Sequence, residues 1–361
     1  MSATTTDRHE VALLRLVAHG LVGGQPADPV VAARTALATQ AQDLPGALRS
    51  LALRTSGRSV AAVTDACDAG ALVRSWPMRG TLHLVPAEDL AWLLRTCASR
   101  AERAARTRRA ALGLDATTLD RASAVAVEAL GGGSRLRRAD LLAVWDAAGV
   151  STDGQRGYHL IASLAHAGVL CLGPMARPAE GSTRGPEQLL VACDTWLPSR
   201  AETADADAPA ALALRFVTGH GPSTVADLAR WAGITLTQAR AGVAEVRDRL
   251  TAVTVDDTEY LMDPTVRDRL DAARDEAAGV LLLPGFDEYL LGYADRSAAL
   301  DPQHADRIVP GGNGMFRPTV VLDGQVVATW RRERGDLVLD PFAPLAPGVV
   351  RQAEEAFARL P

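Results

Sequence analysis

The sequence predicts a mainly helical fold with some β-structure (α+β), in which three tandem winged helix-turn-helix units precede a small β-barrel or sheet domain. Three observations predict this class. Ala, Leu and Val dominate the 361 residues while aromatic side chains make up only 4%, and Ala and Leu are strong helix formers. A helix–glycine–strand pattern recurs along the chain. Strand-forming runs gather after residue 277.

The recurring pattern is a helical stretch that ends at a glycine and is followed at once by an apolar strand. It is found in residues 68–73 and again in residues 166–171. Glycine is favoured just after a helix because it adopts positive φ angles without strain. Residues 139–150 and 226–234 read as a helix, a glycine turn and a second helix, which is the signature of a helix-turn-helix. We therefore expect three such units.

The expected units divide the chain into four domains. They are winged helix 1 over residues 8–110, winged helix 2 over 111–198, a linker with winged helix 3 over 199–265, and a β-barrel-like domain over 266–361. In the first domain, helices are predicted over residues 29–38 and 45–54, with Asp43 as a candidate N-cap. A hairpin is predicted from strands over residues 72–76 and 80–85 with a loop around residues 77–79, and strand alternation there places Arg79, Thr81 and His83 on one face.

The last domain is predicted from β-rich runs and one turn. Asp323-Gly324 between two such runs is a strong hairpin signal, because both residue types tolerate the positive φ angles of a tight turn. Strands are predicted over residues 280–283, 319–322, 325–330 and 337–339, and a closing helix over residues 349–360. Trp145, Trp231 and Trp330 are expected to be core residues rather than groups that stack on bases.

Composition excludes several kinds of chemistry. All 38 basic residues are Arg, so a P-loop lysine and a lysine Schiff base are excluded. The four cysteines stand far apart in the sequence, so we expect buried thiols rather than a zinc or iron–sulfur site. No apolar run approaches the length of a membrane span, and the N-terminus lacks a secretory pattern. These features predict a cytoplasmic protein without cofactor or metal.

The charge is unevenly distributed. A net charge of −5 argues mildly against nucleic acid, but a local basic surface can still bind phosphates. Six arginines crowd residues 95–109 with only Glu102 to oppose them, and we expect them to be unpaired: Arg95, Arg100, Arg103, Arg106, Arg108 and Arg109. The alternative is an ordinary solvated helix face.

Five short segments, in order along nearly the whole chain, resemble those of the AlkZ-like or YcaQ-like DNA glycosylases, whose first described member confers resistance to the crosslinking antibiotic azinomycin B. The segments are Gln40-Ala41-Gln42-Asp43, Met78-Arg79-Gly80-Thr81-Leu82-His83-Leu84, Gly219-His220-Gly221-Pro222, Leu283-Pro284-Gly285-Phe286-Asp287-Glu288-Tyr289-Leu290-Leu291-Gly292-Tyr293 and Phe316-Arg317-Pro318-Thr319.

The resemblance implies tandem winged helices scaffolded by a β-barrel and curved into a channel for duplex DNA. It also implies a catalytic motif of Gln, an apolar residue, then Gln or Asp. Gln40 and Gln42 match the Gln-type branch, which is that of the antibiotic-resistance enzymes. The expected substrate is double-stranded DNA with N7-alkylated purines, either bulky antibiotic–guanine adducts or interstrand crosslinks.

The chemistry of such a substrate is compatible with two amides. Alkylation at N7 makes the purine cationic, so the base leaves as a neutral molecule and needs no strong general acid. An amide offers a carbonyl acceptor for water and N–H donors for orientation, although it cannot titrate near pH 7. Residues i and i+2 do not face each other on an α-helix. The backbone at Gln40 and Gln42 should therefore be a turn or an extended piece.

Further residues are candidates for supporting roles. Arg79, Thr81 and His83 are expected near the lesion or a phosphate, or else in a wing that only packs. Asp43, Asp287 and Glu288 are expected to orient the glutamines or to serve the fold. DNA or lesion contacts are also expected from Arg103, Arg106, Arg109, Asn313 and Arg317.

The alternative function is a non-enzymatic tandem winged-helix regulator whose glutamines read adenine edges. We expect a nucleoid-associated monomer that does not contact membranes, although the sequence leaves the oligomeric state and the identity of the adduct open.

Overall fold

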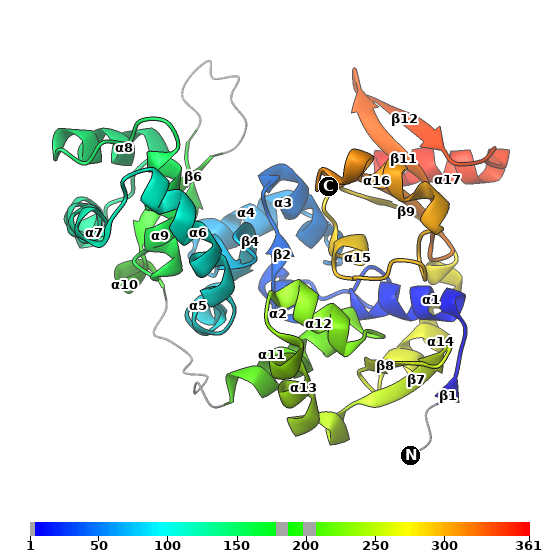
Figure 1. Cartoon of the computed structure of the whole chain (residues 1–361). Coiled ribbons are helices and arrows are strands. Elements are labelled where there is room, and N and C mark those ends of the chain that lie inside the picture. The colour runs from blue at the N-terminus through cyan, green and yellow to red at the C-terminus, as the bar shows by residue number, and fades with distance from the viewer. Residues whose placement is uncertain (1–3, 178–186, 198–206) are drawn as a thin grey trace. The chain divides into compact units, whose positions relative to one another are not determined.

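The computed structural model describes residues 4–177, 187–197 and 207–361. The chain forms two compact units, which Figure 1 draws together. Unit 1 combines Met1–Val63 with Asp207–Pro361, and unit 2 is Thr64–Ala206. The boundary falls inside α4 (Val60–Asp68), within the first of the four expected domains. The finer division into four domains stays a prediction.

The core of unit 1 is built around α1 (Arg8–Ala18). The Asp7 side chain caps this helix by accepting a hydrogen bond from the Glu10 backbone N–H, and all apolar residues from Val11 to Ala18 are buried. They pack against α14 (Val266–Ala277), against the C-terminal strands and against Tyr289. Segments from both ends of the chain thus share one hydrophobic core.

A helix–strand–helix segment follows α1. It consists of α2 (Pro29–Ala36), β2 (Thr39–Gln40) and α3 (Leu44–Leu53). Asp28 caps α2, while Asp43 occupies the N-cap position of α3 without a side-chain cap bond. The two predicted helices are confirmed, and both end within two residues of the expected bounds.

Three helices and a hairpin form the middle part of unit 1. They are α11 (Ala208–His220), α12 (Val225–Ala232), α13 (Leu236–Glu245), β7 (Thr251–Val255) and β8 (Thr258–Met262). Thr224 and Asp227 form a capping box at the start of α12, and Gly233 at its end has a φ of 71°. The predicted helix–glycine–helix arrangement of residues 226–234 is therefore confirmed. The short β1 (Thr4–Thr5) runs parallel to β7.

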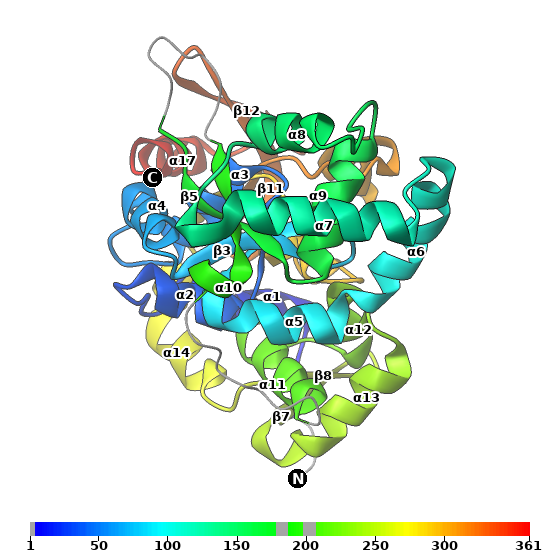
Figure 2. The ribbon, with the colours of Figure 1, turned by 90° about the vertical axis from the view of Figure 1, so that its left-hand side faces the viewer.

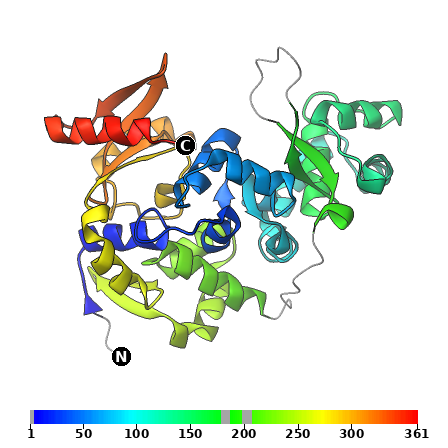
Figure 3. The same cartoon turned by 180° about the vertical axis from the view of Figure 1, so that it is seen from behind.

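The C-terminal part of unit 1 holds an open antiparallel sheet. Its strands are β9 (Val280–Leu283), β10 (Thr319–Leu322), β11 (Gln325–Glu333) and β12 (Asp336–Pro341), in the order β12-β11-β10-β9. Because β9 and β12 lie at opposite edges, the expected closed barrel is not formed by the described residues. Instead α17 (Pro347–Ala358) packs against β9, as Figure 3 shows, and its Phe357 contacts Trp330. A covering helix buries the apolar sheet face that closure would otherwise bury.

Short helical pieces connect this sheet. Between β9 and β10 lie α15 (Glu288–Leu291), η4 (Pro302–His304), α16 (Ala305–Ile308) and η5 (Pro310–Gly312). The turn between β10 and β11 is Asp323-Gly324, whose φ angles of 50° and 75° are those of the predicted tight hairpin.

Unit 2 consists of helices around antiparallel strands. The helices are α5 (Leu90–Cys97), α6 (Ser99–Ala111), η2 (Gly131–Gly133), α7 (Ala116–Leu130), α8 (Arg138–Ala147), α9 (Arg156–His166) and α10 (Cys193–Trp196). The strands are β3 (Leu72–Met78), β4 (Thr81–Pro86), β5 (Leu170–Met175) and β6 (Gln188–Ala192), in the order β4-β3-β5-β6. Figure 2 shows α7 and α9, which pack on these strands.

The β3–β4 hairpin is tighter than expected. Met78 pairs with Thr81, so the turn is Arg79-Gly80 rather than a loop around residues 77–79. Both turn residues have positive φ, 56° and 70°, as a type I′ hairpin requires. Arg79 is therefore held in a conformation that ordinary side chains adopt rarely.

The apolar predictions are confirmed. Trp145, Trp231 and Trp330 are buried, and so are all four cysteines. Burial raises the pKa of Cys67 and of Cys97 to about 12, so both thiols stay protonated at neutral pH. Among the described helices, none has the length and apolar character required to cross a membrane.

Candidate active site

The two glutamines lie on an extended piece of backbone that leaves α2. Leu37, with a φ of 62°, ends the helix, and β2 carries Gln40. Gln40 Nε2 donates to Gln42 Oε1 over 2.9 Å, and the Gln42 backbone N–H donates to Gln40 Oε1 over 3.3 Å. The expectation that this backbone is extended or turning is confirmed. The i and i+2 amides meet because Ala41, between them, points into the core.

Exposure differs sharply between the two amides. Gln40 is buried, with 5% of its surface exposed, whereas Gln42 and Asp43 are exposed. The pair therefore spans the boundary between the core and solvent. A buried amide with fixed partners can orient an exposed one, and the exposed one can meet substrate.

Glu288 holds the backbone of Gln40. Its Oε1 accepts the Gln40 backbone N–H over 2.9 Å, and its Oε2 accepts Trp231 Nε1–H over 2.9 Å. Glu288 is the first residue of α15 and only 1% exposed. A buried carboxylate must be hydrogen-bonded to be tolerated, and here its bonds join α15 and α12 to β2.

One histidine adjoins this carboxylate, and a second histidine lies next to the first. His220 Nε2 lies 3.7 Å from Glu288 Oε2, and the His220 ring stacks on Phe216 with centroids 4.6 Å apart. The Tyr293 hydroxyl donates to the His220 carbonyl over 2.7 Å. It therefore accepts from His19 Nε2, 2.8 Å away. Burial, followed by the charges of His220, Arg54 and Arg15, lowers the pKa of His19 well below its ordinary value.

Two glycines allow close packing around His220. A Cβ on Gly219 would lie 2.2 Å from the Thr35 carbonyl oxygen, and one on Gly292 would lie 2.8 Å from His220 Cδ2. Gly219 thus lets α11 approach α2 closely, just before the chain turns toward β2. Gly221 of the same segment packs elsewhere, because a Cβ there would lie 2.7 Å from Met262 Cα.

Asp287 belongs to a separate ion pair behind the glutamines. Arg54 donates to both of its carboxylate oxygens at 2.9 Å, and the Ser50 hydroxyl donates to Oδ2 at 2.7 Å. The Tyr289 backbone N–H also bonds to Oδ1, so Asp287 caps α15. Asp287 therefore fixes α15 to α3, and Glu288 fixes α15 to β2. Of the three supporting carboxylates expected from the sequence, only exposed Asp43 makes no such link.

Arg79, Thr81 and His83 lie together at the hairpin tip of unit 2. Arg79 Nη2 donates to His83 Nε2 over 3.1 Å, so His83 Nδ1–H donates to the Thr81 carbonyl, 2.9 Å away. Because one ring nitrogen accepts, this His83 is neutral. His83 is buried and the other two are half-buried, and their expected role near the lesion or a phosphate stays a prediction.

The arginines of α6 divide into two groups. Arg103 and Arg106 are exposed. Arg109 is buried and ion-paired with Glu102, and it also donates to the Ser163 hydroxyl over 2.9 Å. Arg108 donates to Gln155. The expectation of six unpaired arginines, with Arg109 available to DNA, is therefore wrong: a helix that packs on α9 turns one side inward.

Asn313 and Arg317 lie on the exposed loop that precedes β10. Asn313 Oδ1 accepts the Met315 backbone N–H over 2.9 Å, and Arg317 Nη1 lies 3.5 Å from the Arg307 carbonyl. Both residues belong to unit 1.

The sequence pattern did not identify His19, His220 and Tyr293 as neighbours of the glutamine motif. His19 received no role and Trp231 only that of a core residue, although His220 and Tyr293 stand in two of the five matching segments. Their position in those segments was the available signal. Among residues 4–177, 187–197 and 207–361, no group of three His, Cys, Asp or Glu side chains could hold a metal ion.

Comparison with known proteins supports a common fold. The solved structure of Streptomyces sahachiroi DNA glycosylase AlkZ is similar with a TM-score of 0.78 at 22% identity, over 98% of this chain and 95% of that chain. A curated relative, the interstrand DNA cross-link repair glycosylase of Streptomyces sahachiroi, is 28% identical over 298 residues, which are 80% of this chain and 78% of that protein.

A family model matches residues 33–361 and defines the class of protein as a DNA glycosylase, an enzyme that cleaves N-glycosyl bonds in DNA repair. The family is the one described as DNA glycosylase AlkZ-like, and the chain belongs to it. The sequence-based resemblance is thereby confirmed. The family match favours the glycosylase over the alternative of a non-enzymatic regulator.

Proposed function

We propose that this protein is a monofunctional glycosylase that hydrolyses the N-glycosidic bond of N7-alkylated purines, with Gln40 and Gln42 placing the water. The observation that carries the proposal is the amide pair: Gln40 bonds to Gln42 over 2.9 Å and is itself anchored by Glu288. Such a pair can position water without titrating, which suits a cationic base that leaves as a neutral molecule.

Gln40 and Gln42 are assigned different roles because their side chains differ in exposure. Buried Gln40 is fixed by Glu288 and by the Gln42 backbone, so it acts as the rigid partner. Exposed Gln42 presents its amide toward solvent, where it would hold the water that attacks the sugar carbon. Preorganised dipoles of this kind are worth about 3 kcal/mol where positive charge develops on the sugar.

The attacking group should be water rather than an amine. The chain contains no Lys, so a lysine imine that would cut the strand cannot form. The expected product is therefore an abasic site in an unbroken strand.

DNA would be held by three winged helices and a β-rich domain, with the boundaries 8–110, 111–198, 199–265 and 266–361. The element order of the third, three helices followed by the β7–β8 hairpin, supports this organisation. Contacts to DNA or the lesion are assigned to Arg79, Thr81, Arg103, Arg106, Asn313 and Arg317, and His83, which is buried, is assigned the role of orienting Arg79. We place the protein in the cytoplasm at the nucleoid, as a monomer.

The substrate class proposed is a bulky guanine adduct or an interstrand crosslink. The curated relative is named as an interstrand cross-link repair glycosylase, and the Gln-type motif is present in this chain. Duplexes with N7-methylguanine and with an N7-linked crosslink would test small and large substrates in parallel.

The deciding experiment is single-turnover base release by the double variant Gln40→Ala with Gln42→Ala. Loss of one positioning group raises the barrier by about 2–4 kcal/mol, so either single variant should slow release roughly 30-fold to 1,000-fold and the double variant at least as much. The effect should be smaller for a labile methyl adduct. DNA affinity should stay near that of the parent. Gln352→Ala, at an exposed site on α17, is the matched control and should behave as the parent.

Two results would contradict the assignment. Release by the double variant at the parent rate would remove the glutamines from catalysis. Strand cleavage that accompanies base release would contradict the water mechanism, because an amine nucleophile would then have to be present.

A further inference from the structure

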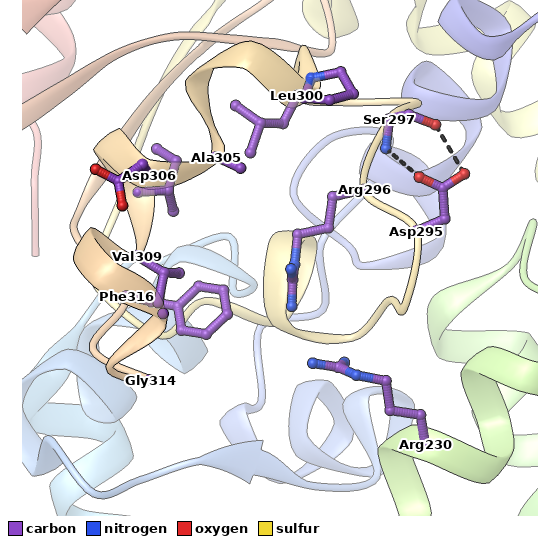
Figure 4. Close-up of a pocket in the computed structure, with 13 residues that line it drawn as sticks. Arg230, Asp295, Arg296, Ser297, Leu300, Ala305, Asp306, Val309, Gly314 and Phe316 are labelled. Atoms are coloured by element: carbon purple, nitrogen blue, oxygen red, sulfur yellow. Dashed lines mark hydrogen bonds between the residues drawn. The ribbon is translucent and has the colours of Figure 1, made fainter.

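A second candidate site is a pocket of about 570 Å³ in unit 1. Its walls come from α12, from residues 295–300 and from the short helices and loop between residues 302 and 316, as Figure 4 shows. The volume falls within the range of about 300–1,000 Å³ that is usual for small-molecule sites. None of the site residues expected from the sequence lines it.

Two arginines at this pocket point toward each other. Figure 4 shows the guanidinium groups of Arg230 and Arg296 facing one another. Arg296 Nε donates to the Leu290 carbonyl over 2.8 Å. Arg230 Nη1 donates to the carbonyls of Tyr293 and Leu291, over 3.0 and 3.3 Å. Backbone carbonyls at the end of α15 thus hold two like charges together.

The carboxylates nearby do not bridge the pair. Asp295 accepts two hydrogen bonds from Ser297, and Asp306 accepts the Gly311 backbone N–H. Burial, and next the charge of Arg230, lower the pKa of Arg296 to about 10, with a partial offset from Asp227 and Asp295. In the described part of the chain, no side-chain acceptor bonds to either guanidinium group. A pair of converging cations without such an acceptor is suited to an anion.

The rest of the pocket is apolar. Leu300, Ile308, Val309 and Phe316 line it, and the Arg296 guanidinium lies 5.0 Å from the centre of the Phe316 ring. The ligand should therefore combine an anionic group with an apolar or planar body.

We propose that this pocket binds a phosphate ester, with the phosphate between Arg230 and Arg296 and the attached sugar or base against the apolar wall. Arginine forks match phosphate oxygens in paired hydrogen bonds. The phosphate could belong to a DNA strand or to a free nucleotide. The proposal does not depend on the substrate assigned to the glutamine pair, because it concerns binding only.

The test uses the full-length protein and three variants. Arg296→Gln removes one cation. Ala305→Glu adds a carboxylate at an exposed lining position and removes no buried contact, so it keeps the test valid if Arg296→Gln folds poorly. Arg351→Gln, exposed on α17, is the control.

One arm titrates deoxyguanosine 5′-monophosphate, deoxyguanosine and inorganic phosphate against each protein and follows thermal unfolding. A free-nucleotide site predicts stabilisation by the monophosphate, none by the nucleoside, and affinity that falls about tenfold in both pocket variants. The other arm measures the salt dependence of binding to an undamaged duplex. A strand phosphate predicts that the slope of log K against log salt decreases by about 0.9 in both variants.

A positive result in either arm supports the site and shows whether the phosphate belongs to a free nucleotide or to a DNA strand. If both pocket variants match the Arg351→Gln control in both arms, the proposal is overturned. Base release from alkylated DNA, measured separately with saturating protein, reports on the glutamine pair and not on binding at the pocket.

Discussion

Single residues behind the glutamine pair should also influence the rate of base release. Glu288 bonds the Gln40 backbone N–H with one oxygen and Trp231 Nε1–H with the other. Both partners are N–H donors, so each side-chain oxygen at position 288 must accept a hydrogen bond. An isosteric amide cannot supply two acceptor oxygens.

Glu288→Gln should therefore both destabilise the fold and slow base release. Its NH₂ group would face one of the two N–H donors and leave it unsatisfied, at a cost of about 1–3 kcal/mol of unfolding free energy. Release should slow about tenfold or more if Gln40 shifts. Urea unfolding and single-turnover kinetics measure the two effects, with exposed Glu354→Gln on α17 as the control. Parent values for both quantities would show that Glu288 does not hold Gln40.

Helix α6 is the element that most directly tests the proposed DNA surface. Its exposed arginines Arg103 and Arg106 face solvent, while Arg109 is committed to Glu102 and Ser163. Each phosphate contact contributes about 0.9 to the salt slope of DNA binding. The exposed and the buried arginines of one helix should therefore respond differently to substitution.

The double variant Arg103→Gln with Arg106→Gln should bind all duplex sequences more weakly and lower the salt slope by up to about two. Arg109→Gln should leave the slope unchanged and reduce stability, because Glu102 would lose its buried partner. Equilibrium binding over a series of salt concentrations checks both outcomes. An unchanged slope in the double variant would remove α6 from the DNA surface.

Some elements of the fold were predicted correctly from the local sequence pattern. The strand over residues 280–283 and the Asp323-Gly324 turn were predicted at their observed positions, because a short apolar run and a turn dipeptide are local signals. The barrel was wrong, since closure depends on which edges pair. In this structure β9 and β12 lie at opposite edges of the sheet, and α17 packs against β9.

At the scale of the whole molecule, the buried histidine cluster couples folding to pH. His19 lies between Tyr293, His220 and two buried arginines, and its pKa is well below the ordinary value. Below about pH 6.5 the unfolded chain binds a proton at His19 that the folded protein does not bind. The stability due to neutral His19 is therefore complete above about pH 6.5 and is lost as the pH falls toward the lowered pKa.

The parent should lose about 1.4 kcal/mol more unfolding free energy between about pH 7.5 and 5.5 than the variant His19→Gln. Gln retains an N–H donor for Tyr293 but does not titrate. Carboxylates elsewhere act equally in both proteins, so the difference isolates His19. Urea titrations at the two pH values provide the measurement, and equal losses in the two proteins would contradict the assignment.

The sequence by itself determined the local elements and the family of this protein. Capping residues, glycine turns and apolar periodicity act over a few residues, and short segments such as Gln40-Ala41-Gln42 and Gly219-His220-Gly221-Pro222 are visible in one dimension. The extended backbone at the glutamines also followed from local geometry, because i and i+2 side chains cannot meet on a helix.

Only the tertiary structure decided the partners of those residues. Glu288 is 248 positions from Gln40, and Arg230 and Arg296 stand far apart in the sequence but face one another in the fold. Arg109 is indistinguishable from Arg106 in the sequence, yet packing buries one and exposes the other. The physical reason is that hydrogen bonds, burial and charge act through space, so a side chain's role depends on neighbours that local pattern does not specify.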